Sequence, residues 1–223
     1  RLLTSVLGEQ RPLPPEHALT IAGQVLAALD FAHRASGEGG RPLCVVHRDV
    51  SPSNILLSWH GEVKVADFGI ARGGHRTRST ALGLIRGKYA YMAPEQARGE
   101  EVDGRADLFA LGVVLHELLT ARRLFAGATD AELQRRVAEG DFEVTGIERL
   151  PALLRSLLML ALSPDPRGRY QDAAEMLSDV TAAVRTLRLP SGTLELAQWL
   201  GVRFPAEERP SPDGADAIAA EAT

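Results

Sequence analysis

The stretch that decides the fold of this chain reads His47-Arg48-Asp49-Val50-Ser51-Pro52-Ser53-Asn54. Apolar runs flank it, over residues 43–46 before it and residues 55–57 after it. This order predicts a strand, a tight polar loop and a second strand. The loop carries Asp49, whose carboxylate can accept the proton of an attacking hydroxyl. It also carries Asn54, whose amide oxygen can bind Mg2+ without adding negative charge.

Two further motifs follow at defined spacings. Asp67-Phe68-Gly69 begins thirteen residues after Asn54, and Ala93-Pro94-Glu95 begins twenty-six residues after Asp67. The three motifs match H-R-D-x-x-x-x-N, D-F-G and A-P-E in order and in spacing. On these residues the chain resembles the large lobe of a protein kinase, close to the bacterial members of the eukaryotic-like Ser/Thr family. The resemblance covers about residues 1–188.

The resemblance implies an α+β fold, mainly α, with short strands around the catalytic loop. We expect the large lobe over residues 1–188, an extension packing on it over residues 189–204, and a disordered linker or tail over residues 205–223. The sequence begins with Arg1 and contains neither a glycine-rich phosphate loop nor a V-A-I-K-like lysine. We therefore expect an N-terminally truncated domain, with the small lobe absent from this chain.

Local patterns predict the main elements of the lobe. The apolar residues 43–46 predict a strand, in which Cys44 is a small core residue. The segment 103–120 is apolar nearly all round, which is typical of a buried helix. Helical spacing or composition predicts helices in the segments 17–35, 103–120, 131–139, 151–162 and 171–187.

Charge and composition exclude several classes of protein. The 223 residues carry a formal net charge of -4, which gives no support for nucleic-acid binding. A single cysteine, Cys44, excludes an internal disulfide framework and favours a reducing compartment, so we expect a cytoplasmic protein. No apolar run in this chain reaches the length of a membrane-spanning helix.

The resemblance also implies the parts of a phosphotransfer site. Asp49 is expected to be the catalytic base, and Asn54 and Asp67 are expected to hold Mg2+ against the phosphates of ATP. His47 and Phe68 are expected to stack in an internal apolar column. The expected partner is a protein substrate with a Ser or Thr hydroxyl, and self-association for autophosphorylation is a further expectation.

Regulatory roles follow from the same resemblance. Arg48 is expected to bind a phosphate on the segment between D-F-G and A-P-E, because a guanidinium binds phosphate in bidentate fashion. Three hydroxyl residues of that segment are candidate phosphorylation sites: Thr77, Ser79 and Thr80.

Other matched positions are expected to be structural. Glu95 and Arg169 resemble a buried ion pair that links two loops, and Asp107 matches an Asp that holds the backbone of the catalytic loop. Five histidines outside the motif show no metal-ligand spacing, and we read them as surface or packing residues: His17, His33, His60, His75 and His116.

The sequence departs from the family pattern at two positions. Ser51 stands where Ser/Thr kinases usually have a lysine that contacts the transferred phosphate, and Lys88 stands where they usually have a threonine. Because Ser51 lacks the charge of this lysine, an alternative interpretation is a pseudokinase that signals by docking. A kinase-like phosphotransferase for small molecules is a second alternative, which the A-P-E segment and the pair Glu95–Arg169 disfavour.

Overall fold

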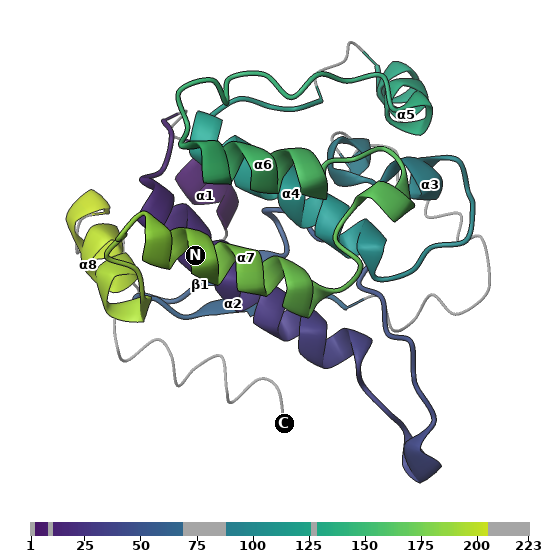
Figure 1. The fold of residues 1–223 in the computed structure, drawn as a ribbon, viewed down its shortest axis with the longest axis horizontal. Helices are drawn as coiled ribbons and strands as arrows, with labels where there is room; N and C mark the ends of the chain where they lie inside the picture. Colours follow the sequence, from purple (N-terminus) through teal and green to yellow (C-terminus); the bar gives the residue numbers. More distant parts are fainter. Residues whose placement is uncertain (1–2, 9–10, 69–87, 126–128, 205–223) are drawn as a thin grey trace, which may run out of the picture.

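The computed structural model describes residues 3–8, 11–68, 88–125 and 129–204. Within these residues the fold is mainly helical and contains one two-stranded sheet (Figure 1). Short 3-10 helices lie at Glu38–Gly40, Lys88–Tyr91 and Pro166–Gly168. The helices and strands are α1 (Leu3–Leu7), α2 (Pro15–His33), β1 (Ile55–Leu57), β2 (Val63–Val65), α3 (Pro94–Ala97), α4 (Arg105–Thr120), α5 (Asp130–Glu139), α6 (Ala152–Ala161), α7 (Ala173–Thr186) and α8 (Thr193–Arg203).

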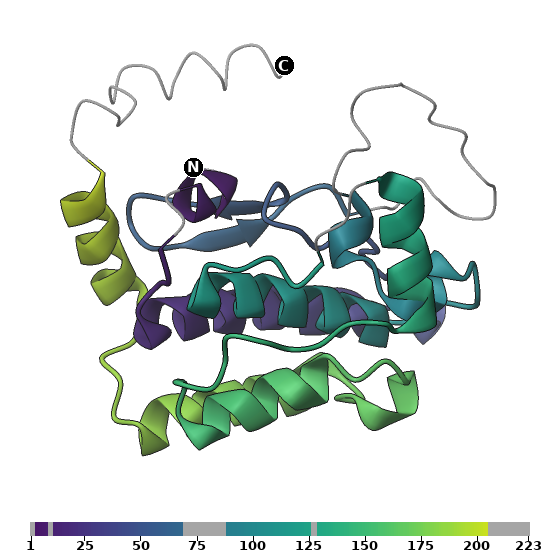
Figure 2. The ribbon, with the colours of Figure 1, turned by 90° about the horizontal axis from the view of Figure 1, so that it is seen from above.

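The elements are stacked in layers, which Figure 2 shows edge-on. The β1–β2 hairpin lies on one face of a layer formed by α2 and α4, and α6 and α7 cover the other face. Helix α8 crosses one end of this stack, and α5 stands at the opposite end (Figures 1 and 2). The mainly helical lobe with short strands that the sequence predicted is therefore present.

Helix α4 runs through the centre of the lobe. Every residue from Ala106 to Leu119 is buried, which confirms the prediction of a helix without a polar face. A Cβ atom added at Gly112 would lie 2.9 Å from the Cβ of Ala161 on α6. A glycine at this position therefore allows α4 and α6 to pack closely.

The main hydrophobic core joins α2, α4, α6 and α7. Helix α2 contributes Ile21, Val25 and Leu29, and α7 contributes Met176 and Val180, all nearly or fully buried. The apolar spacing that predicted helices over 17–35 and 171–187 reflects this shared face. Both helices are present, and each begins and ends within two residues of the predicted limits.

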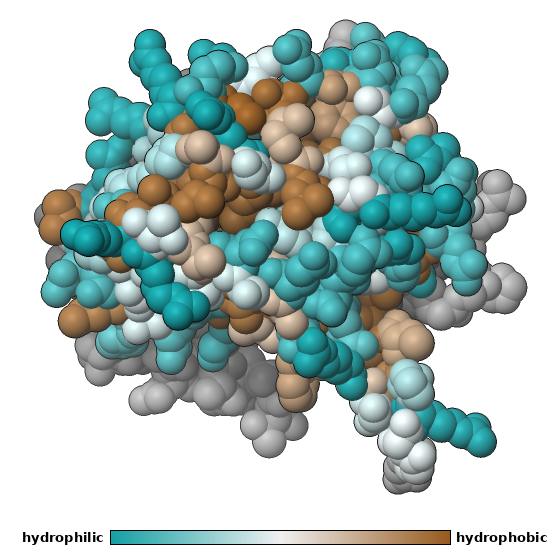
Figure 3. Space-filling view, viewed as in Figure 1, coloured by the Kyte–Doolittle hydropathy of each residue, from teal (hydrophilic) through white to brown (hydrophobic). Residues whose placement is uncertain are grey.

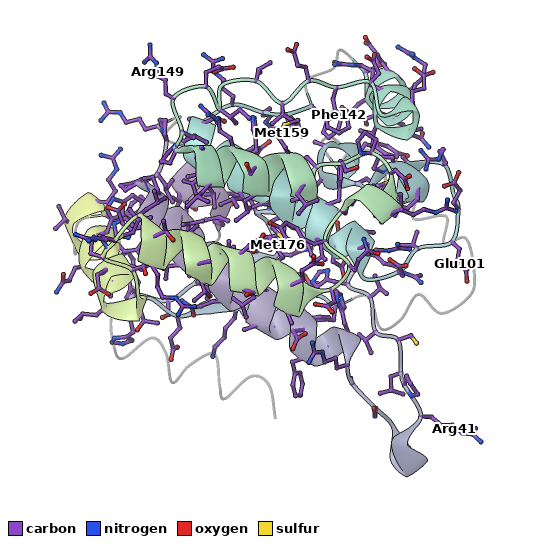
Figure 4. The ribbon with its side chains drawn as sticks, in the orientation of Figure 1. Arg41, Glu101, Phe142, Arg149, Met159 and Met176 are labelled. Carbon is purple, nitrogen blue, oxygen red and sulfur yellow. The ribbon has the colours of Figure 1, made fainter. Side chains whose placement is uncertain are left out.

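A second core cluster packs α5 and the 3-10 helix at Lys88–Tyr91 against one side of α4. Three aromatic rings meet there: Phe109 of α4, Phe125, and Phe142, which follows α5. Phe142 is labelled in Figure 4. Helix α5 begins where the Thr129 hydroxyl accepts a hydrogen bond from the backbone N–H of Glu132. This cluster fixes the loop that leads into the A-P-E motif.

The outer face of α6 exposes apolar side chains. Figure 3 shows apolar atoms gathered on the face that carries α6 and α7. Leu153, Met159 and Leu160 are among the exposed residues of α6, and Met159 is labelled in Figure 4. Met176 of α7 is instead fully buried against α2. Within the residues that the structure describes, no helix combines the length and apolar character needed to cross a membrane.

The hairpin places two motif residues side by side. Strands β1 and β2 are antiparallel, with Ile55 opposite Val65 and Leu57 opposite Val63. The pairing continues at the open end, where the N–H of Ala66 donates to the carbonyl of Asn54 over 2.8 Å. Asp67 follows directly, so the hairpin brings the ends of the first two motifs together.

One prediction is wrong. Residues 43–46 form no strand, and Cys44 is exposed, with a backbone φ of 47°. Near this run, Ser36 and Pro42 form an isolated bridge, and the N–H of Leu43 donates to the carbonyl of Ala35 at 2.9 Å, but neither contact extends into a strand. An apolar run without a neighbouring strand cannot form a sheet ladder, so these residues reach the catalytic loop as irregular chain.

Candidate active site

The backbone of the catalytic loop is held by a buried carboxylate. Asp107, in the first turn of α4, accepts hydrogen bonds from the backbone N–H of His47 at 2.8 Å and of Arg48 at 2.7 Å. Arg48 has a φ of 65°, a conformation that non-glycine residues seldom adopt. The two bonds stabilise this unusual turn, and α4 thus positions the residue that follows it, Asp49.

A third group reaches the same carboxylate. His33, the last residue of α2, lies with its Nε2 atom 2.9 Å from Oδ2 of Asp107. The sequence offered no signal for this contact, because helical spacing identifies the buried face of α2 but not the partner of a half-buried histidine. The contact ties α2, α4 and the catalytic loop to one another.

The ring of His47 connects the loop to the hairpin. Its Nδ1 atom accepts a hydrogen bond from the N–H of Asp49 at 3.2 Å, so Nε2 carries the proton donated to the carbonyl of Ala66 at 2.9 Å. The ring also packs against Phe68, with 4.6 Å between the ring centroids. The histidine thus holds the residues beside Asp67 against the residues beside Asp49.

Asn54 closes the loop on itself. Its side-chain Nδ2 donates to the carbonyl of Asp49 at 2.8 Å, and its backbone N–H donates to the carbonyl of Ser51 at 3.0 Å. Because the amide nitrogen is used within the loop, the amide oxygen is the group that remains for a cation. Asp67 is exposed at the open end of the hairpin, with a φ of 59°.

The donor set of Asn54 and Asp67 fits an Mg2+ site of a particular kind. One carboxylate and one amide oxygen cannot enclose an ion, and no three His, Cys, Asp or Glu side chains form a metal site within residues 3–8, 11–68, 88–125 and 129–204. Mg2+ is often held by one or two protein oxygens together with water and substrate phosphates. The residues therefore fit a metal that arrives with a nucleotide.

Ser51 brings no charge to the site. It is nearly buried, and its hydroxyl lies 2.8 Å from the hydroxyl of Ser53. The side chain of Lys88, at the second position that departs from the family pattern, lies outside the described residues.

Arg48 presents its side chain to solvent. Its carbonyl accepts a hydrogen bond from Nε2 of Gln96 at 2.7 Å, which links the catalytic loop to α3. The three candidate phosphorylation sites Thr77, Ser79 and Thr80 lie outside the described residues. The structure therefore brings Arg48 to the surface beside Asp49 but does not place its expected partner.

Glu95 and Arg169 form a buried bidentate ion pair. The two guanidinium NH2 groups donate to the two carboxylate oxygens over 2.7 and 2.9 Å. Arg169 also donates to the carbonyls of Ser163 and Pro164, and its guanidinium lies 4.7 Å from the ring centroid of Phe109. The pair fixes α3 and the loop before α7 to each other.

A cavity of about 510 Å3 lies beside the catalytic loop, and two of its lining residues, Tyr91 and Glu117, carry no signal in the sequence. Tyr91 donates from its hydroxyl to Glu117 at 2.7 Å, and the other carboxylate oxygen of Glu117 is buried without a partner among the described residues. Burial raises the pKa of Glu117, and burial together with the nearby Glu117 raises that of Tyr91. Pro52 and Arg123 also line the cavity.

Comparison with known proteins identifies the class. The family model described as the protein kinase domain matches residues 1–180. The chain therefore belongs to the protein kinase family, which confirms the resemblance seen in its three motifs.

Among its relatives, the tyrosine-protein kinase MasK of Myxococcus xanthus (strain DK1622) is 43% identical over 201 residues, covering 89% of this chain and 30% of MasK. The serine/threonine-protein kinase PknL of Mycobacterium tuberculosis (strain ATCC 25618 / H37Rv) is 37% identical over 190 residues, covering 84% of this chain and 46% of PknL. PknB of Mycobacterium leprae (strain TN), also named a serine/threonine-protein kinase, is 35% identical over 182 residues, which is 80% of this chain and 28% of PknB. The chain thus spans less than half the length of these relatives.

Proposed function

We propose that this chain is the catalytic lobe of a Ser/Thr protein kinase that transfers the γ-phosphate of ATP to a protein hydroxyl with Mg2+. The observation that carries the proposal is the junction of the catalytic loop and the hairpin. There Asp107 holds the backbone before Asp49, and the bond between Ala66 and Asn54 brings Asp67 beside Asn54. A site of phosphoryl transfer needs such fixed positions, because its catalysis is mainly positioning and charge stabilisation.

In this proposal the residues divide the work of the transfer. Asp49 orients the substrate hydroxyl and accepts its proton as the oxygen bonds to the γ-phosphorus, while the bond from phosphorus to the bridging oxygen breaks and ADP leaves with its electron pair. Asn54 and Asp67 would hold Mg2+, which supplies charge neutralisation at the phosphate oxygens. The sequence has no lysine at Ser51, so the cation of the usual loop is missing.

The type of residue that accepts the phosphate, Ser or Thr rather than Tyr, is a separate part of the proposal. The loop Ser51-Pro52-Ser53-Asn54 resembles that of Ser/Thr kinases, and PknL and PknB carry that name, whereas MasK is named a tyrosine kinase. Phosphoamino-acid analysis of the autophosphorylated protein separates the two. Phosphoserine or phosphothreonine supports the proposal, and phosphotyrosine alone overturns this part of it.

The experiment for the activity uses the full-length protein that contains this chain. With labelled Mg-ATP, Asp49→Ala and Asp67→Ala are expected to abolish phosphate incorporation, while Glu101→Gln, an exposed acid before α4 (Figure 4), is the control. Equal labelling in all four proteins, wild type included, would refute the assigned roles. An absence of labelling in the wild type would favour the pseudokinase, which Ser51 motivates.

The remaining parts of the proposal concern the setting of the enzyme. We expect a protein substrate in the cytoplasm, and self-association of two copies when one phosphorylates the other. Incubation of an Asp49→Ala protein with an active tagged copy tests the second point. Labelling of the inactive copy supports transfer between molecules, whereas labelling confined to the active copy opposes it.

A further inference from the structure

Helix α8 lies beyond the matched family range, which ends at residue 180. It packs across one end of the lobe, beside the closed end of the β1–β2 hairpin (Figures 1 and 2). The open end of the same hairpin carries Asn54 and Asp67. The hairpin therefore connects α8, which lies outside the range matched by the protein kinase family, to the proposed ligands of the metal.

Apolar side chains dock α8 on the lobe. Leu196 and Leu200 are fully or nearly fully buried and belong to the same core cluster as Ile55 of β1. Phe204, the residue directly after α8, is also buried, and its ring stands edge-on to Trp59 at the turn of the hairpin, with centroids 6.5 Å apart. The helix is thus part of the packing that supports the hairpin from its closed end.

The backbone of α8 touches the turn itself at Gly61. This buried glycine has a φ of 78°, and a Cβ atom added to it would lie 1.8 Å from the carbonyl oxygen of Thr193. Real Cβ atoms do not approach backbone oxygen that closely. A side chain at Gly61 would therefore push the first turn of α8 and the hairpin apart.

Two residues one turn apart on α2 hold both elements in register. Gln24 donates from Nε2 to the carbonyl of Gly61 and accepts at Oε1 from the N–H of Val63, both at 2.9 Å. The hydroxyl of Thr20 accepts a hydrogen bond from the N–H of Gly192, just before α8, at 3.2 Å. The position of the turn is thus fixed from two sides, by α2 and by α8.

A displacement at the turn would be transmitted along the ladder. Ser58 at the closed end lies about 13 Å along the strand from Asn54, at a rise of about 3.3 Å per residue. The paired strands and the bond from Ala66 to Asn54 make this span one hydrogen-bonded unit. A shift or loosening at Gly61 therefore reaches the residues that precede Asp67.

We propose that α8 helps to position the metal that binds with the nucleotide. It does so by fixing the β1–β2 hairpin at Gly61. Gly61 and Gln24 are then positioning residues that act through Asn54 and Asp67. This inference rests on the proposed function in one respect, namely that Asn54 and Asp67 hold Mg2+ with ATP.

The test compares Gly61→Ala with Gly39→Ala in the full-length protein. Both glycines have a φ of 78°, but a Cβ atom at Gly39 meets nothing within 4 Å, so the control carries the same backbone strain without the clash. Amide hydrogen exchange over residues 55–66 reports on the hairpin without any need for activity. The Mg2+ concentration for half-maximal ATP binding reports on the metal.

We expect Gly61→Ala to speed exchange along the whole hairpin, including the N–H of Ala66, and Gly39→Ala to leave it unchanged. The Mg2+ concentration for half-maximal ATP binding, which is the Mg2+ requirement, is expected to rise by about tenfold. This is the lower end of the loss in metal affinity that follows when a group supporting the metal ligands is removed. Val137→Ala, in the other core cluster, controls for general loss of stability and is expected to leave the Mg2+ requirement unchanged. Leu200→Ala replaces Gly61→Ala if the latter does not fold.

Two results would overturn the proposal even if ATP binding by the wild-type protein depends on Mg2+. One is faster exchange at the turn alone, with Ala66 unchanged. The other is faster exchange along the hairpin with an unchanged Mg2+ requirement. If the wild-type protein binds ATP without any dependence on Mg2+, the assignment of the metal site fails, and the role proposed for α8 fails with it. The exchange data would then still decide whether α8 fixes the hairpin.

Discussion

The guanidinium of Arg169 donates two hydrogen bonds to the carboxylate of Glu95, and both side chains are buried. The two residues are 74 positions apart in the sequence. Their pairing joins the A-P-E motif at the start of α3 to the loop before α7. Because neither charge can turn to water when its partner is lost, the pair fixes the relative position of these two loops.

The first prediction concerns the stability of this pair. Glu95→Ala leaves a buried guanidinium without its carboxylate, so the free energy of unfolding is expected to fall by about 3–5 kcal/mol. Urea denaturation measures this loss. The control is Arg135→Ala, which breaks the exposed pair Arg135–Glu139 and is expected to cost less than about 1 kcal/mol. A similar loss of unfolding free energy in both variants would show that the buried pair stabilises the fold no more than an exposed pair does.

The second prediction concerns the support of the catalytic loop. Asp107→Asn replaces one acceptor oxygen by an amide group, which cannot accept hydrogen bonds from both N–H groups and from His33. We expect a loss of about 1.5–3 kcal/mol in the free energy of unfolding, since these are bonds to a charged group. We also expect phosphotransfer to fall by about 100-fold, because Asp49 loses its fixed position.

The control for that variant is Asp103→Asn, the same substitution at a carboxylate that is half-exposed and paired with Arg105. It is expected to leave the rate at saturating ATP nearly unchanged. Initial rates and urea denaturation are measured on both proteins. Unaltered turnover in Asp107→Asn would contradict the link between the carboxylate and the position of Asp49.

The third prediction concerns pH and Glu117. Burial raises the pKa of Glu117, so the folded protein binds its proton more tightly than the unfolded chain does. The stability associated with this proton is present below the ordinary pKa of about 4.3 and is lost as pH rises through the raised value. Glu117→Gln removes this dependence.

The unfolding free energy of Glu117→Gln is therefore expected to exceed that of the wild type increasingly as pH rises from about 4 towards 8. Denaturation at several pH values in this range measures the difference, and Tyr91 stays neutral throughout because its pKa is raised. Glu101→Gln, at an exposed position, is the control. A difference that stays constant with pH would show that burial does not act on this carboxylate.

The fourth prediction concerns regulation. A phosphate on Thr77, Ser79 or Thr80 adds about -1.5 to -2 charges, which the exposed guanidinium of Arg48 is expected to bind. Activity should then rise with time after phosphatase treatment, and Arg48→Ala should lose that rise. A peptide phosphorylation assay measures the activity, and mass spectrometry measures the phosphate on the segment at the same time points. If replacement of all three hydroxyl residues by Ala leaves the rise intact, this segment is not the switch.

The sequence by itself determined the family, the mainly helical lobe and the order of its motifs. Each motif is a short run of residues with fixed spacing, and helices such as α4 and α7 follow from apolar residues that recur along the chain. These signals are local, so they can be read without knowledge of the partners. The same reasoning failed over residues 43–46, because an apolar run forms a strand only beside another strand.

Only the tertiary structure decided which distant groups meet. The contact of His33 with Asp107, the bond from Tyr91 to Glu117, and the fit of Gly61 beneath Thr193 join residues separated by 74, 26 and 132 positions. No periodicity encodes such pairs, because they depend on how the helices pack around the hairpin. The position of Asp49 and the raised pKa of Glu117 follow from that packing and from the burial that it creates.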